Sequence, residues 1–125
     1  MASTKLNQLI DLLYERTQKG QVNWESTPDE DAFVVHFSEL SLSIRSGYDE
    51  DGDEFVSISL RNQNGRVIDN DYFWDAMTET GAWDKAFSLY SAAKRKALGV
   101  DEALDRILDE LKTNAVVGRA RSRQK

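Results

Sequence analysis

The chain has 125 residues, of which 40% are hydrophobic and 30% charged, a composition typical of one globular domain and not of a disordered chain. It contains no cysteine, which excludes disulfides and thiolate metal sites and favours a cytoplasmic location. The formal net charge is −6, and segment 25–84 alone holds 15 acidic and three basic residues, a net charge of −12. Such a field repels nucleic acids and membrane surfaces.

The N-terminal segment has the apolar periodicity of an amphipathic helix over residues 4–19, and Gly20 is well suited to end it. The residues that recur at the helical spacing are Leu6, Leu9, Ile10 and Leu13. Asp11 interrupts the apolar residues, so we expect no secretory signal peptide here. No segment approaches the roughly 20 apolar residues of a membrane-spanning helix, and we expect no membrane partner.

Three segments in the middle of the chain alternate apolar and polar residues, which predicts strands with one buried face. They are Phe33–Ser38, Leu40–Arg45 and Val56–Arg61. A tight reversal near residues 38–40 joins the first two segments. The dipeptide Asn64-Gly65 tolerates the positive φ angles of a two-residue hairpin, which predicts a fourth short strand over Arg66–Asp69.

Two helices are expected to close the fold. The first starts near Gly81 or Ala82 and ends at Leu98-Gly99, and the second starts with Asp101 as its cap. The apolar stripe of the first helix is Trp83, Phe87, Tyr90 and Ala97, and that of the second is Leu104, Ile107, Leu108 and Leu111. The aromatic-rich segment before them, residues 69–83, is predicted to be an irregular connection.

The predicted architecture is a single α+β domain over residues 1–112, with the order α-β-β-β-β-α-α. Its antiparallel meander buries one face, and the helices pack on that face. Residues 113–125 are predicted to be a disordered basic tail. The basic residues of this tail are Arg119, Arg121, Arg123 and Lys125. Without these four, 12 basic residues oppose 22 acidic ones, so residues 1–112 have a net charge of −10.

Three segments of the chain follow a sequence pattern that is also found in other proteins. They are the N-terminal leucine helix followed by "GQVNW", the hairpin "SISLRNQNGRVI" and the closing "LYSAAKRKALGVDEALDRILDELK". In these pieces the chain resembles a set of small uncharacterised bacterial proteins. The resemblance spans most of residues 6–112 and implies the same order of helices and strands. It implies no activity, and no functional residue is carried over to this chain.

The densest acidic segment lies between two predicted strands. Its carboxylates are those of Asp49, Glu50, Asp51, Asp53 and Glu54. A helix–loop–helix calcium site with Gly52 at position 6 would need oxygen ligands at positions 1 and 12, where Gly47 and Ile58 stand. We therefore interpret the segment as a solvated hairpin turn, with acidic docking to a partner or weak binding of a divalent cation as the alternatives.

Alternation places small polar and basic side chains on the sheet face that points away from the core. They are Ser41, Ser43, Arg45, Ser57, Ser59 and Arg61. RNA-binding sheets stack bases on aromatic residues of such a face, and here Phe55 is the one clear aromatic candidate in an acidic field. We expect this face to be solvated or to contact a protein, and not to bind nucleic acid.

Tyr72, Phe73 and Trp74 concentrate three aromatic residues in the predicted connection. Tyrosine and tryptophan are favoured at the energetic centres of protein interfaces. One interpretation is that the rings cover the open end of the core, and the other is that they form a patch for a partner or for self-association. The basic tail would contact phosphate or an acidic partner only weakly, with an affinity that falls as salt rises.

Catalytic motifs are missing from the sequence. His36 is the only histidine, and no partner that would orient or tune it can be named. There is no nucleophile-elbow motif, no paired-histidine zinc motif and no glycine-rich phosphate loop. We therefore predict that the protein is not an enzyme and uses no cofactor or dedicated metal site.

These observations favour a small, non-catalytic, cytoplasmic protein-interaction or adaptor domain, for which a second copy of the chain is one candidate partner. The first alternative is an acidic decoy or inhibitor that presents carboxylates to a basic nucleic-acid-binding protein. The second alternative is a weak divalent-metal binder or an enzyme.

Overall fold

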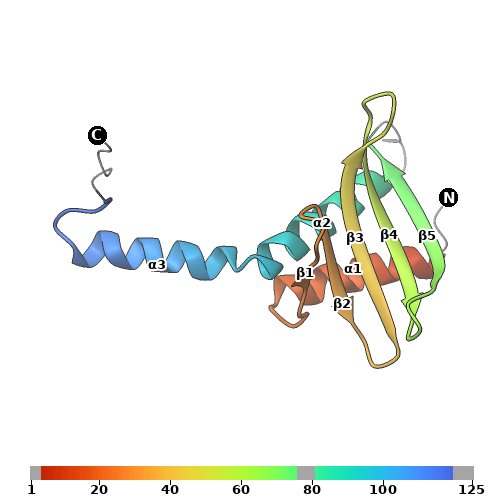
Figure 1. The fold of residues 1–125 in the computed structure, drawn as a ribbon, viewed down its shortest axis with the longest axis horizontal. Helices are drawn as coiled ribbons and strands as arrows, with labels where there is room; N and C mark the ends of the chain where they lie inside the picture. The colour runs from red at the N-terminus through yellow and green to blue at the C-terminus, as the bar shows by residue number, and fades with distance from the viewer. Residues whose placement is uncertain (1–3, 76–80, 120–125) are drawn as a thin grey trace.

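A five-stranded antiparallel sheet and three helices make up the fold (Figure 1). The structure is a computed structural model, and it describes residues 4–75 and 81–119. In chain order the elements are α1 (Thr4–Gln18), β1 (Glu25–Ser26), β2 (Ala32–His36), β3 (Leu40–Tyr48), β4 (Glu54–Asn62), β5 (Val67–Trp74), α2 (Ala82–Ala97) and α3 (Val100–Thr113). The α+β class predicted from the sequence is confirmed.

The sheet is a simple meander, because its strands are neighbours in the order β1-β2-β3-β4-β5. The sequence predicts four strands, and the structure has one more. The additional strand, β1, has only two residues, and it pairs with β2 through Glu25 opposite Val34 and Ser26 opposite Phe33. The last strand is also longer than the predicted Arg66–Asp69, since β5 continues to Trp74, into the segment 69–83 that is expected to be an irregular connection. Residues 76–80 of that segment lie outside the described residues.

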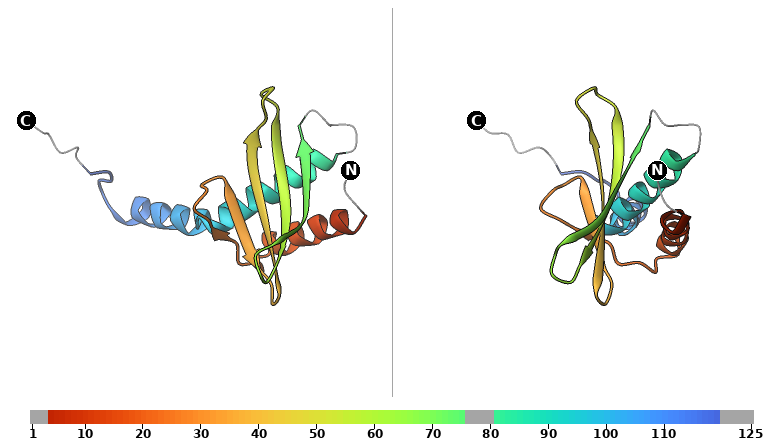
Figure 2. Two further views of the ribbon diagram at one scale, coloured as in Figure 1. Left: turned by 45° about the vertical axis from the view of Figure 1, so that its right-hand side comes forward. Right: turned by 90° about the vertical axis from the view of Figure 1, so that its right-hand side faces the viewer.

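The helices α1 and α2 lie side by side and cover one face of the sheet, while the other face is open (Figures 1 and 2). The core forms between these two layers. Its fully buried large side chains are Phe33, Leu42, Ile44, Val56 and Leu89. In α1 the predicted stripe is confirmed, because Ile10 and Leu13 are buried and Leu6 and Leu9 pack against the core.

A buried hydrogen bond ties the end of α1 to the segment before the sheet. The indole Nε1–H of Trp24 donates to the hydroxyl Oγ1 of Thr17 over 3.0 Å, and both side chains are buried. On folding, the indole N–H loses its hydrogen bonds to water, and the bond to Thr17 replaces them. Elsewhere in the core, burial and the nearby carboxylate of Asp31 raise the pKa of the Tyr90 hydroxyl.

Three apolar residues are exposed, although the strand alternation and the helical stripe predict that they are buried: Phe37, Leu40 and Phe87. Phe37 follows the last residue of β2 and Leu40 begins β3, so both lie at the tight reversal and not over the core. On α2 the buried face is centred on Ala86, Leu89 and Ala93, and Phe87 lies at its margin. The residues that lie innermost on this helix include small alanines, which let α2 approach the sheet closely.

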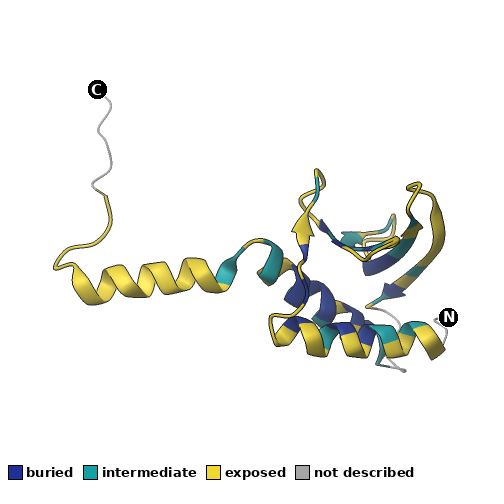
Figure 3. Ribbon diagram, turned by 90° about the horizontal axis from the view of Figure 1, so that it is seen from below, coloured by how far each residue is buried: buried dark blue, intermediate teal, exposed yellow. Residues whose placement is uncertain are grey.

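The helix α3 does not cover the sheet, although its apolar stripe predicts a packed helix. It extends away from the rest of the molecule, and none of its residues is buried (Figures 1 and 3). It begins directly after Gly99, so Asp101 lies in its first turn and is not its cap. Residues 114–119 form no helix or strand, and the rest of the predicted tail, residues 120–125, lies outside the described residues.

The Trp24–Thr17 hydrogen bond gives a test of the core. Thr17→Val keeps the shape of the side chain and removes the acceptor, so we expect it to lower the free energy of unfolding by about 1–3 kcal/mol. Thr17→Ser keeps the hydroxyl and should lose less stability than Thr17→Val. Urea unfolding followed by tryptophan fluorescence measures both, and equal stability of Thr17→Val and the wild type would contradict the assignment.

Candidate functional site

The candidate site is the open face of the sheet, which we call the outer face. The pairing of β3 with β4 sets Ser41 opposite Arg61, Ser43 opposite Ser59 and Arg45 opposite Ser57. Directly opposite residues point to the same side of a sheet, so the two predicted polar rows do lie together. Ser57 is an exception to the expected exposure, because it is buried between Arg45 of β3 and Tyr72 of β5, the residues that stand opposite it.

The aromatic residues of β5 divide between the two faces. Because Tyr72, Phe73 and Trp74 are consecutive in a strand and not in an irregular connection, their side chains alternate. Phe73 is buried in the core, which agrees with the first interpretation of these rings and leaves Phe73 unavailable to a partner. Tyr72 and Trp74 lie on the outer face, where Tyr72 is 41% exposed and Trp74 is half-buried.

Three rings form a compact cluster on the outer face. Tyr72 and Trp74 are stacked, with ring centroids 5.4 Å apart and an interplanar angle of 19°. The ring of Phe55, which is buried, meets Tyr72 edge-on at 5.3 Å and Trp74 at 6.4 Å. Rings at such separations attract one another and hold a fixed arrangement. The sequence singled out Phe55 and Trp74 separately, and only the register of β4 with β5, which pairs them directly, brings them together.

Arg45 completes this cluster from the other side of Phe55. Its guanidinium carbon lies 5.1 Å from the centroid of the Phe55 ring, within the range of a cation–π contact. Gly47 leaves room for the ring, because a Cβ at this position would lie 3.0 Å from Cζ of Phe55, closer than most Cβ contacts in proteins. We call Arg45, Phe55, Tyr72 and Trp74 the outer-face patch.

The acidic segment predicted to be a turn is the connection between β3 and β4, so its interpretation as a hairpin is confirmed. The Asp49 backbone N–H donates to the Asp53 carbonyl over 2.9 Å, and Gly52 takes the positive φ angle that such a turn requires. Glu50, Asp51 and Asp53 are exposed, while Asp49 and Glu54 are half-buried. We call residues 49–54 the acidic hairpin.

The acidic hairpin adjoins the outer-face patch through one contact. The indole Nε1–H of Trp74 donates to Oδ2 of Asp49 over 3.1 Å. This contact fixes the ring of Trp74 and places carboxylates at the margin of the aromatic cluster. The structure therefore joins three surfaces that the sequence suggested separately: the polar rows, the β5 aromatics and the acidic segment.

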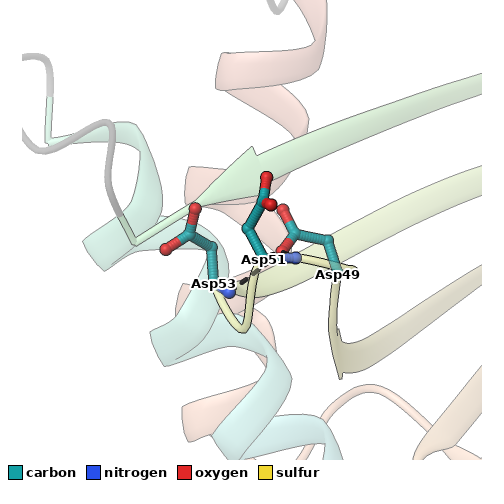
Figure 4. Close-up of side chains that lie close together, drawn as sticks. All are labelled: Asp49, Asp51 and Asp53. Atoms are coloured by element: carbon teal, nitrogen blue, oxygen red, sulfur yellow. Dashed lines mark hydrogen bonds between the residues drawn. The ribbon is translucent and has the colours of Figure 1, made fainter.

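The carboxylates of Asp49, Asp51 and Asp53 lie within 4.8 Å of one another at the tip of the hairpin (Figure 4). Oxygen donors of this kind suit calcium or magnesium. However, Oδ1 of Asp49 accepts hydrogen bonds from the backbone N–H groups of Asp51 and Asp53, both over 2.9 Å, and Oδ2 accepts from Trp74. The hydrogen bonds of the turn account for this geometry, and exposed acidic groups commonly gather without an ion.

His36 lies apart from the outer-face patch. It is exposed at the end of β2, opposite Ser41, and it lines a shallow hollow with Phe37 and Glu39 at the β2–β3 reversal. The polar groups around it belong to turns and strand ends. This environment gives no reason to assign His36 a chemical role.

Comparisons with known proteins do not add to these observations: no family model, no curated protein and no solved structure matches the chain. Within residues 4–75 and 81–119, no helix combines the length and the apolar character needed to cross a membrane.

The close approach of Gly47 to Phe55 gives a test of the outer-face patch. Gly47→Ala should displace the Phe55 ring and lower the free energy of unfolding by about 1–3 kcal/mol, because an added methyl group overpacks the site. Phe55→Leu shortens the side chain and should remove most of that penalty in the double variant. Urea unfolding of the wild type, the two single variants and the double variant gives the coupling energy between Gly47 and Phe55. If Gly47→Ala costs as much stability in the Phe55→Leu background as in the wild type, the close approach of Gly47 to Phe55 is contradicted.

Proposed function

We propose that the protein is a small, non-catalytic interaction domain whose outer-face patch binds another protein. The observation that carries this proposal is the stacked pair of Tyr72 and Trp74, exposed or half-exposed on a rigid sheet beside Arg45. Tyrosine, tryptophan and arginine are the residues that most often dominate binding energy at interfaces. When these residues gather on one face of a sheet, they indicate a binding surface more specifically than aromatic residues scattered over the surface do.

The rigidity of the patch supports the same function. Phe55 packs beneath the exposed rings, and Asp49 holds the indole of Trp74, so these side chains are already ordered before a partner binds. Ordering flexible side chains on binding costs about 0.5–1.5 kcal/mol for each of them. A patch that is ordered in advance avoids part of this cost, which favours binding.

The chemistry around the patch suggests the character of the partner. The carboxylates of the acidic hairpin border the rings, and segment 25–84 has a net charge of −12. We propose a partner surface with an apolar centre for the two rings and basic side chains opposite the hairpin. Nucleic acid is disfavoured by the same charge, and the lack of cysteine favours the cytoplasm as the compartment.

An acidic decoy of a basic nucleic-acid-binding protein is the second candidate. It is favoured by the exposed carboxylates of Glu50, Asp51 and Asp53 in the connection between β3 and β4, which extends beyond the rest of the sheet (Figure 1). Under this alternative the carboxylates supply most of the binding energy, and the aromatic rings are secondary. The two candidate functions therefore differ in which residues supply the binding energy and in how the affinity of the complex depends on salt.

The discriminating experiment compares proteins captured by the unaltered chain and by three groups of variants. Tyr72→Ala and Trp74→Ala should reduce capture of a genuine partner by about 30-fold each, the effect of losing roughly 2 kcal/mol at a binding hot spot. Tyr48→Ala is the matched control, since Tyr48 is 70% exposed on the same hairpin and makes no ring contact with the patch. Circular dichroism melts check that every variant folds.

Charge removal and salt separate the two candidates. A decoy complex should be lost in the variant Glu50→Gln, Asp51→Asn, Asp53→Asn. It should also dissociate between about 0.1 M and about 1 M salt, where the Debye length falls from about 10 Å to about 3 Å. A complex centred on the rings should persist in high salt. Capture that is unchanged by Tyr72→Ala and Trp74→Ala in folded protein would contradict the proposed function.

A further inference from the structure

The helix α3 carries an apolar stripe that nothing in the described chain covers. Figure 3 shows the helix exposed over nearly its whole length, beyond the end of α2. The stripe consists of Leu104, Ile107, Leu108 and Leu111, each between 47% and 56% exposed. A 14-residue helix is marginal in water by itself, and most helices gain their stability by packing an apolar face. The stripe therefore needs an occupant.

We propose that the occupant is α3 of a second copy of this chain, packed antiparallel. Along the stripe the residues are separated by three, one and three positions, a spacing that reads the same in both directions. A two-fold axis between Ile107 and Leu108 therefore sets Leu104 of one copy against Leu111 of the other. This is the self-complementary contact that a symmetric dimer requires.

The charges beside the stripe fit the antiparallel arrangement. At 100° per residue, Asp101, Asp105 and Lys112 lie within about 40° of one another on one flank of the helix. The same two-fold axis brings Lys112 of one copy to a level between Asp101 and Asp105 of the other. Asp101 already forms an ion pair with Arg95 over 2.6 Å, so Asp105 is the main partner of Lys112.

Parallel pairing would oppose like charges. It would bring together the acidic first turns of both helices and both acidic bodies, since residues 1–99 hold 17 acidic and 10 basic residues, a net charge of −7. Antiparallel pairing puts the two acidic bodies at opposite ends of the paired helices, so they do not face each other. A membrane surface fits less well, because α3 holds five acidic residues and two basic ones, and interfacial helices are rich in lysine and arginine.

The size of the stripe sets the strength of the dimer. Four side chains that are about half exposed cannot supply the roughly 800 Å² that each partner buries in a stable interface of standard size. The dimer should therefore dissociate in the micromolar range, and its population should depend on protein concentration. Sedimentation equilibrium of the full chain from about 1 μM to about 1 mM covers this range.

Paired variants test whether α3 is the interface. Leu108→Arg should weaken the dimer by about 100-fold or more, because it introduces a charge at the centre of the apolar contact. The melting temperature of the monomer should not change, since α3 contributes no buried residue. Leu12→Arg is the matched control: Leu12 is a 55% exposed leucine on α1, and its substitution should leave the dimer intact.

Charge reversal and cysteine cross-linking test the orientation. Lys112→Glu should weaken the dimer, and Asp105→Lys in the same chain should restore it. The chain has no cysteine of its own, so introduced cysteines report unambiguously. A disulfide requires Cα atoms within about 7 Å. Antiparallel pairing puts the two copies of Leu108 one residue apart along the axis and the two copies of Leu104 seven residues apart, about 10 Å.

Leu108→Cys should therefore form a disulfide-linked dimer, and Leu104→Cys should not do so by itself. An equimolar mixture of Leu104→Cys and Leu111→Cys chains should cross-link into heterodimers. Efficient homodimers of Leu104→Cys would overturn the antiparallel arrangement. A chain that stays monomeric at every concentration, or that loses its dimer equally with Leu12→Arg, would overturn the proposal and would leave another protein as the occupant of the stripe.

Discussion

The pairing of β3 with β4 is the constraint on which the rest of the structure depends. Ile44 stands opposite Ile58 in this register, and both are buried against the helices. Because side chains alternate, the same register turns the serine and arginine rows to the outer face and sets Gly47 opposite Phe55. A slip of one residue would exchange the two faces and expose the core. The interior and the outer-face patch are therefore two consequences of one pairing.

Much of this fold could be predicted from the sequence, since alternation and helical spacing identify α1, α2, α3 and three strands. The strand β1 was missed because two residues, Glu25 and Ser26, carry no periodic pattern. The extent of β5 was missed for a different reason. Asp69, Asn70 and Asp71 are poor strand formers, and the tertiary pairing with β4 overrides their local preference.

The candidate site was predicted in parts. The polar rows and the acidic hairpin follow from alternation and turn chemistry, but their junction at Trp74 and Asp49 depends on which strands are neighbours. The contact of Arg45 with Phe55 also has room because Gly47 lacks a side chain, and only the observed register shows that this glycine faces the ring. An apolar stripe such as that of α3 predicts that a helix needs a partner, and it does not say whether the partner is the sheet or another chain.

The central claim is that α1, α2 and the sheet close the core without α3. Hydrogen–deuterium exchange of the full chain, resolved by segment and measured at low micromolar concentration, tests it most directly. We expect amides of β3, β4 and α2 to exchange only through global unfolding. We also expect amides of α3 to exchange orders of magnitude faster, the behaviour of a helix without buried contacts. Protection of α3 equal to that of α2 in dilute protein would contradict the account.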